Sequence, residues 1–279
     1  MKGNGKMKKS NVLKLTESAI MLAFAVVLSV MKLMDLPYGG SITLCSMLPV
    51  IVIAYRHGFA WGLCTSSAFA LLQLLLGASV LSYATSPLAA VLIILLDYLL
   101  AYGFLCIAGV FTKSKMNQTA ALALSVVISL VLRYACHVIS GYVVWRDISI
   151  PADQAWIYSF GYNASYMLPE LIITLIGAVY VSKVLNFRSE TITRAAGEKD
   201  RMSVSASVFS IIGKTVLAAG AVWSTLVLIP HMQDESGVIS ITNVPAEAWK
   251  FAGIIFVAAI IITCVLLFAA KTLSKPKKA

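Results

Sequence analysis

Residues 86–111 read SPLAAVLIILLDYLLAYGFLCIAGVF, an almost entirely apolar run. Asp97 is its only charged residue. An α-helix rises about 1.5 Å per residue, so a run of this length crosses the ~30 Å hydrocarbon core of a membrane. A soluble helix as long would need a polar face, which this stretch lacks. We therefore expect it to span a membrane.

The same composition runs through the whole chain. Of its 279 residues, 59% are hydrophobic and only 12% are charged, against about 25% charged in an ordinary soluble domain. These values predict an all-α polytopic membrane protein. We expect eight spans, at residues 12–34, 41–55, 58–77, 86–111, 118–143, 157–182, 204–230 and 249–270.

The basic residues predict the orientation of these spans. Lysine and arginine beside a span remain on the cytoplasmic side. Seventeen of the 22 basic residues lie at the two termini or in every second connection between spans. The opposite loops hold only Arg146, with Lys32 and Lys250 at their edges. Both termini are therefore expected in the cytoplasm. The net charge of +10 suits anionic lipid headgroups, and nucleic-acid binding is not expected.

A polar segment divides the chain into two parts. We expect a six-span substrate-binding domain at 1–187, a cytoplasmic linker at 188–203 and a two-span extension at 204–279. The first six spans carry polar and ionisable side chains, whereas the last two are almost entirely apolar apart from Lys214. Function is therefore expected in the first part.

Asp97 is the clearest functional candidate. An ionisable group inside a membrane costs about 2.5–3.5 kcal/mol on insertion scales, so it is a functional candidate by default. Asp97 lies near the middle of its span, and it either contacts a ligand or forms an internal ion pair with Arg133 on the next span.

The fifth and sixth spans place further polar groups at a similar depth. In the fifth span one face holds, at helical spacing, Arg133, His137 and Gly141. In the sixth span one face holds Asn163, Tyr166 and Glu170. A lone histidine in such a helix is more often a hydrogen-bond partner of a neighbouring helix. The matching set on the next span favours a shared site.

Aromatic residues lie at the outer ends of these spans. Trp145 and Trp156 bracket the loop between them, and Tyr142 lies just below. Each tryptophan alone fits the interfacial aromatic belt. Together with a carboxylate, an imidazole and a carboxamide, however, electron-rich rings suit an aromatic organic cation.

Motifs for catalysis and metal binding are absent from the sequence. It has no GxxxxGK[ST] phosphate loop, no HExxH and no CxxC spacing among its five cysteines. A metal ion would need more oxygen or thiolate ligands than the polar residues of these spans provide. We therefore expect no enzyme activity, no catalytic residues, no cofactor and no metal.

Two motifs resemble the ThiT family, the thiamine-specific S-components of energy-coupling factor (ECF) importers. They are Arg133-Tyr134-x-x-His137-x-x-Ser140-Gly141-x-x-x-Trp145 and Tyr158-x-x-x-Tyr162-Asn163-x-Ser165-Tyr166-Met167-Leu168-Pro169-Glu170. A third run, Leu48-Pro49-Val50-x-x-x-Ala54-Tyr55-Arg56-x-Gly58, also fits. The resemblance covers about residues 10–187.

The resemblance implies a six-helix S-component bundle in a bacterial cytoplasmic membrane, with thiamine bound near the outer face. The residues it assigns to the ligand are Asp97, Tyr98, His137, Trp145, Tyr158, Asn163 and, where the family often has a stacking tryptophan, Phe69. It also implies docking on an ECF module of one transmembrane coupling subunit and two ATPases. Small residues on the first span, Ala19 and Ala23, would form that contact.

Other functions remain open. The family usually has glutamate where this chain has Asp97, so a thiamine precursor or another small heterocycle could be the ligand. Because S-components normally have six spans, the eight expected here also leave a stand-alone secondary transporter or a membrane enzyme as alternatives.

Overall fold

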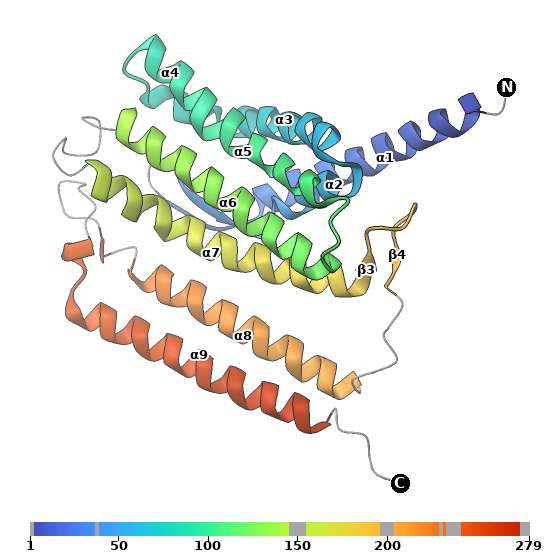
Figure 1. The fold of residues 1–279 in the computed structure, drawn as a ribbon. Helices are drawn as coiled ribbons and strands as arrows, with labels where there is room; N and C mark the ends of the chain where they lie inside the picture. Colours follow the sequence, from blue (N-terminus) through green and yellow to red (C-terminus); the bar gives the residue numbers. More distant parts are fainter. Residues whose placement is uncertain are drawn as a thin grey trace, which may run out of the picture. The chain divides into compact units, whose positions relative to one another are not determined.

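The computed structural model describes residues 3–36, 39–144, 155–195, 204–228, 231–232 and 241–273. Within these residues the chain is helical apart from connections and two short hairpins. Contacts divide it into two units, Met1–Arg194 and Ala195–Ala279. Figure 1 shows the helices of each unit along the chain.

Six helices of the described residues are long and apolar enough to cross a membrane. They comprise Asn11–Val30, Phe59–Leu76, Pro87–Phe111, Gln118–Val143, Tyr158–Val184 and Ala246–Leu273. Each matches a span that the sequence predicts, and the protein is therefore a polytopic helical membrane protein.

The predicted span at 41–55 is wrong. This segment contains strand β2 (Ser41–Thr43), a turn and helix α2 (Leu48–His57), which has ten residues. Ten helical residues cover only about 15 Å, half of a hydrocarbon core. Residues 48–55 are all buried. The segment is apolar because protein surrounds it, and α2 forms the centre of the first unit's core.

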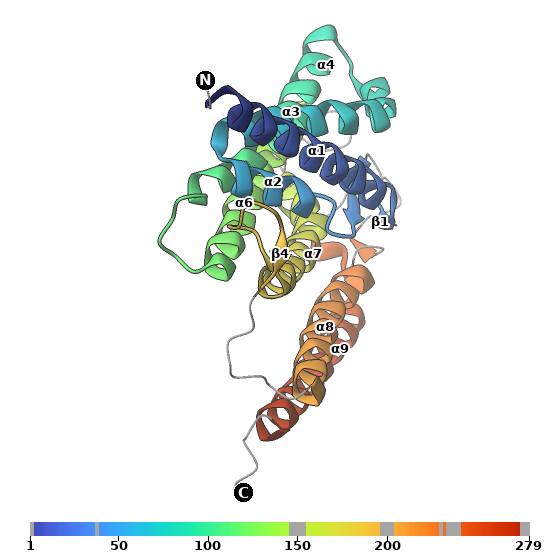
Figure 2. The ribbon, with the colours of Figure 1, turned by 90° about the vertical axis from the view of Figure 1, so that its right-hand side faces the viewer.

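The other N-terminal elements pack around α2. Helix α1 (Gly3–Val30) leads into an antiparallel hairpin of β1 (Lys32–Asp35) with β2. Helix α3 (Phe59–Leu76) follows α2 directly, and the short helix η2 (Ala78–Tyr83) comes next. In Figure 2, α1, α2 and α3 lie beside one another, in agreement with their contacts.

Residues 87–111 form one span whose helical form changes along its length. It runs through α4 (Pro87–Ile93), the π-helix η3 (Ile94–Leu100), the short α5 (Ala101–Gly103) and the 3₁₀-helix η4 (Phe104–Phe111). Ser86 caps its start, since its Oγ accepts from the Ala89 N–H at 3.1 Å. A π-helix hydrogen-bonds i to i+5 and often marks a functional site. Asp97 and Tyr98 of this π-helix and Tyr102 of α5 line the same cavity.

Helices α6 (Gln118–Val143) and α7 (Ala155–Val184) form an antiparallel pair. Pro169 lies inside α7, as the sequence indicates. The pair runs side by side in both ribbon views (Figures 1 and 2). Beyond α7 the chain forms a hairpin of β3 (Leu185–Asn186) with β4 (Thr193–Arg194), which ends the first unit.

The second unit contains α8 (Val204–Leu228), the short helix η6 (Ile241–Asn243) and α9 (Ala246–Leu273). Its two long helices are antiparallel and meet through small residues. A Cβ added at Gly220 would lie only 2.2 Å from the Cβ of Ala259. Ser224 Oγ donates to the Ala252 carbonyl at 2.9 Å, and Thr263 Oγ1 donates to the Gly213 carbonyl at 2.8 Å. Small residues and hydroxyl bonds are typical of helix pairs inside membranes.

Candidate ligand-binding site

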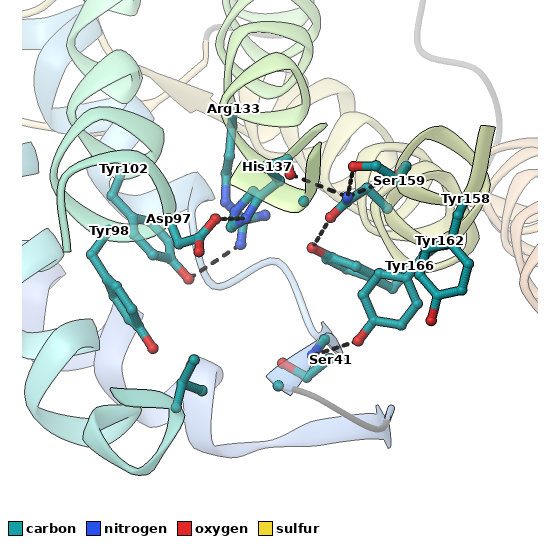
Figure 3. A pocket seen from close by; sticks show the side chains of 15 residues that line it. Ser41, Asp97, Tyr98, Tyr102, Arg133, His137, Tyr158, Ser159, Tyr162 and Tyr166 are labelled. Atoms are coloured by element: carbon teal, nitrogen blue, oxygen red, sulfur yellow. Dashed lines mark hydrogen bonds and ion pairs between the residues drawn. The ribbon is translucent and has the colours of Figure 1, made fainter. Parts of the chain in front are cut away.

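A cavity lies between the π-helical span, α6, α7 and the turn at residues 39–41 (Figure 3). Its lining comprises Gly39, Gly40, Ser41, Val80, Asp97, Tyr98, Tyr102, Arg133, His137, Gly141, Tyr158, Ser159, Tyr162, Asn163 and Tyr166. Five of the seven residues predicted to contact a ligand are brought together here. They are Asp97, Tyr98, His137, Tyr158 and Asn163.

Asp97 is held by two side chains of α6. Its Oδ1 lies 2.9 Å from His137 Nδ1, and its Oδ2 accepts from Ser140 Oγ at 2.7 Å. The other imidazole nitrogen, His137 Nε2, is buried and has no hydrogen-bond partner in the described part of the chain. A buried polar atom without a partner is costly, so this imidazole nitrogen is a candidate for a ligand contact.

Arg133 pairs with Glu170, and the possible ion pair between Arg133 and Asp97 is not formed. Arg133 Nη1 donates to Glu170 Oε2 at 2.8 Å, and both side chains are buried. The other carboxylate oxygen of Glu170 accepts from Thr43 Oγ1. Arg133 Nη2 also donates to the hydroxyl of Tyr102 at 3.2 Å. The arginine charge is thus compensated within its own cluster.

The carboxamide of Asn163 is largely occupied within the protein. Its Nδ2 donates to the Ser159 carbonyl at 2.8 Å, and its Oδ1 accepts from the Tyr166 hydroxyl at 2.7 Å. A weaker bond of 3.3 Å runs from Nδ2 to the His137 carbonyl. Asn163 therefore joins α6 to α7 and fixes the Tyr166 ring, and it also lines the cavity, where the resemblance assigns it to the ligand.

Tyrosine rings form two walls of the cavity. Tyr158 and Tyr162 are stacked, with centroids 6.1 Å apart and planes 14° apart, and Tyr166 meets Tyr162 edge-on at 5.7 Å. Tyr98 and Tyr102 lie on the opposite side in Figure 3, with Asp97 and His137 between the two groups. Ring faces on both sides suit a flat, electron-poor ligand.

Two glycines allow close approach around the cavity. The Gly40 N–H donates to the Tyr162 hydroxyl at 3.2 Å, and a Cβ at Gly40 would lie 2.8 Å from that oxygen. A Cβ at Gly141 would lie 2.1 Å from Ser159 Oγ. Larger residues would therefore displace the β1–β2 connection or separate α6 from α7.

The two other residues predicted to contact a ligand are Phe69 and Trp145. Phe69 is fully buried and does not line the cavity. Its ring meets the Tyr102 ring edge-on, with centroids 5.3 Å apart, so it supports the cavity wall from behind. Trp145 lies outside the described residues. The docking candidates Ala19 and Ala23 are exposed on α1 and belong to a separate surface.

Sequence reasoning missed some of the lining. Tyr102 lies four residues after Tyr98, one helical turn along, so periodicity could have indicated it. The adjacent glycines at 39 and 40 signal a turn. No local pattern indicates that this turn packs against Tyr162, because that contact joins residues 122 positions apart.

Comparison with known proteins covers the part of the chain that forms this cavity. Residues 15–187 match the thiamine transporter protein family (Thia_YuaJ). The thiamine transporter ThiT of Bacillus subtilis (strain 168) is 34% identical over 180 residues, which cover 61% of this chain and 90% of that protein. A solved structure of ThiT from Listeria monocytogenes aligns with a TM-score of 0.50 and 27% identity, covering 62% of this chain and 94% of that one. With its six apolar helices, this is a multi-pass protein of the bacterial plasma membrane, and the chain belongs to the thiamine transporter protein family.

Proposed function

We propose that this chain is the substrate-binding subunit of an ECF-type importer. It binds thiamine in the cavity from the outer side of the membrane. It then delivers the vitamin when docked on a separate ATP-driven module. The relatives bear the name of thiamine transporters, and every cavity-lining residue lies within the matched segment 15–187.

The charge balance of the cavity is the observation that carries this proposal. The Arg133 charge is compensated by Glu170 at 2.8 Å. Asp97, in contrast, is bonded to an imidazole and a hydroxyl, which leave its negative charge in place when His137 is neutral. The Asp97 side chain is only 14% exposed, and a shielded carboxylate without a counter-charge favours a cation. Thiamine carries one on its thiazolium ring.

The other cavity groups match the rest of the thiamine molecule. If the Nδ1–H of His137 donates to Asp97, the neutral imidazole presents Nε2 as an acceptor. That unpartnered atom can receive a hydrogen bond from the amino group of the aminopyrimidine ring. The tyrosine walls provide ring faces, each worth about 0.5–2 kcal/mol to a nearby cation. Trp145, Tyr98 and Tyr158 complete the proposed contacts.

A docking surface is proposed on α1. Ala19 and Ala23 are exposed one turn apart, whereas Ala25 on the inner face is fully buried. Small side chains let two helix backbones approach closely in a membrane, where lipid provides little hydrophobic drive. This face supports docking to the coupling subunit of a module that also carries two ATPases.

The topology forms part of the same proposal. The basic residues favour both termini in the cytoplasm. The 25 residues of α8 are enough to cross the membrane beside α9, which gives the 204–279 extension two spans. Residues 1–187 then form the S-component domain, and 188–203 form a cytoplasmic linker.

Two measurements on the purified chain test the binding function. A mass spectrum of the denatured protein should reveal co-purified thiamine, and calorimetric titration of ligand-free protein should give one tight site. Recovery of a thiamine precursor or another heterocycle would replace the ligand but keep the subunit's role. If the purified protein retains no ligand and shows no heat of binding with thiamine, the proposal is refuted.

A further inference from the structure

Arg56, at the end of α2, has a partner for each of its five N–H donors. Two donate to the Glu17 carboxylate on α1, from Nε at 3.0 Å and from Nη2 at 2.8 Å. Three donate to backbone carbonyls of the segment between β3 and β4. These bonds comprise Nη1 to Phe187 at 2.7 Å, Nη1 to Ser189 at 3.3 Å and Nη2 to Glu190 at 3.3 Å. One side chain thus joins three segments that are distant in sequence.

The Arg56–Glu17 pair is shielded from solvent. The Arg56 side chain is only 2% exposed and that of Glu17 is 13% exposed. Glu17 also contacts His57 Nε2 at 2.9 Å. Burial lowers the pKa of the His57 imidazole, more strongly than its hydrogen bond to Glu17 raises it. Arg56 is therefore the lasting charge partner of Glu17, and the pair has the bidentate geometry of strong arginine–carboxylate contacts.

The Arg56–Glu17 pair lies near the proposed docking face and near the end of the family match. Glu17 faces inward on α1, two residues before Ala19 on the outward face that we propose for docking. The carbonyls belong to the hairpin where the family match ends, at residue 187, and where the chain passes into the second unit after Arg194. The neighbouring Ser18 joins α1 to α3, because its Oγ accepts from Trp61 Nε1 at 2.8 Å.

We propose that Arg56 is a positioning residue that fastens the docking helix α1 to the 185–194 hairpin and so holds α1 in the position from which its outer face docks. This inference rests on the proposed docking of α1. Arg56 contacts neither the cavity nor the outward face of α1. Its effect is therefore expected on transport and not on ligand affinity.

Arg188 provides a matched control on the same hairpin. Its Nε donates to the Tyr55 hydroxyl at 2.8 Å, and its Nη2 donates to the Met116 carbonyl at 2.7 Å. Within the described residues, the Arg188 side chain makes no hydrogen bond or ion pair with α1. Arg188→Gln therefore loosens the hairpin from α2 and from the connection before α6, and leaves α1 and Glu17 in place.

The test compares wild type, Arg56→Gln, Arg56→Lys and Arg188→Gln as full-length chains. Hydrogen–deuterium exchange in detergent reports on residues 11–20 and 185–194, calorimetry gives thiamine affinity, and labelled thiamine measures uptake by cells that depend on this chain. We expect Arg56→Gln to raise exchange about tenfold in both segments, leave affinity within about twofold and reduce uptake about fivefold or more. Lysine offers three donors in place of five, so Arg56→Lys should be intermediate.

Arg188→Gln should raise exchange in 185–194 alone and keep uptake. The proposal is overturned if Arg56→Gln transports normally, if Arg188→Gln loses as much uptake, or if Arg56→Gln loses thiamine affinity, which would indicate a general effect on the fold. Should Arg56→Gln not fold, the same criteria apply to Arg56→Lys. A wild-type chain that does not bind thiamine would refute the proposed function, while the exchange comparison would still decide whether Arg56 joins the two segments.

Discussion

His137 Nδ1 lies 2.9 Å from Asp97 Oδ1, and this bond joins the π-helix η3 to α6 at the cavity wall. It orients the carboxylate and, in the neutral imidazole, leaves Nε2 as an acceptor without a hydrogen-bond partner in the described residues. The proposed site therefore consists of a carboxylate for the cationic ring and an imidazole for the amino group of the second ring.

Replacing the imidazole should weaken binding directly. We expect His137→Phe to lower thiamine affinity about tenfold or more, because a ligand donor loses its acceptor and Asp97 loses a bond. Ser140→Ala is the control, since Ser140 bonds to Asp97 but does not line the cavity. It should cost only about threefold. Calorimetry measures both, and equal losses would assign His137 a supporting role only.

The ion pair between Glu170 and Arg133 should affect thiamine binding, although Glu170 does not line the cavity. Glu170→Gln leaves the Arg133 charge uncompensated beside the cavity, so we expect about tenfold weaker thiamine binding and lower thermal stability of the ligand-free protein. The double variant Arg133→Met with Glu170→Met removes both charges and should bind more tightly than Glu170→Gln alone. If Glu170→Gln binds thiamine like wild type, the charge argument fails at this position.

Trp145 should differ from Trp156. The Trp156 ring stacks on Tyr142 with centroids 3.9 Å apart and is 45% exposed, away from the cavity lining. Trp156→Phe should keep affinity, as expected for an interfacial tryptophan. Trp145→Ala should remove most of the fluorescence quenching by thiamine and most of the affinity. Full affinity in Trp145→Ala would return this residue to the aromatic belt.

The docking face should separate binding from transport. Ala19→Leu or Ala23→Leu should block uptake and leave thiamine affinity unchanged, because a larger side chain keeps the partner helix away. The same substitution at Ala258, which is exposed on α9, provides the control for added bulk and should transport normally. Normal uptake in both α1 variants would show that the spacing of the two alanines is coincidental.

Much of the membrane architecture could be predicted from hydrophobic length, because lipid requires long apolar helices. The segment 41–55 failed because a short helix buried in protein is as apolar as one in lipid, and composition does not distinguish the two. The π-helical form of residues 94–100 was also missed, since no residue type specifies it.

The residues of the site could be predicted better than the hydrogen bonds and ion pairs that they form. Depth and helical spacing placed Asp97, His137 and Asn163 at one level of the bundle. The partner of Arg133 could not be predicted, because it depends on how α6 and α7 are rotated about their axes. The sequence indicated only Asp97 as a possible ion-pair partner, and packing instead brought Glu170 to 2.8 Å.

The most direct test of the account concerns the role of the Asp97 charge. Thiamine and an uncharged analogue, in which carbon replaces the thiazolium nitrogen, are titrated by calorimetry into wild type and Asp97→Asn. We predict that wild type prefers thiamine by about tenfold or more, and that Asp97→Asn loses most of this preference while it still binds the analogue. An unchanged preference for the cation in Asp97→Asn would contradict the claim that Asp97 is the counter-charge of the ligand.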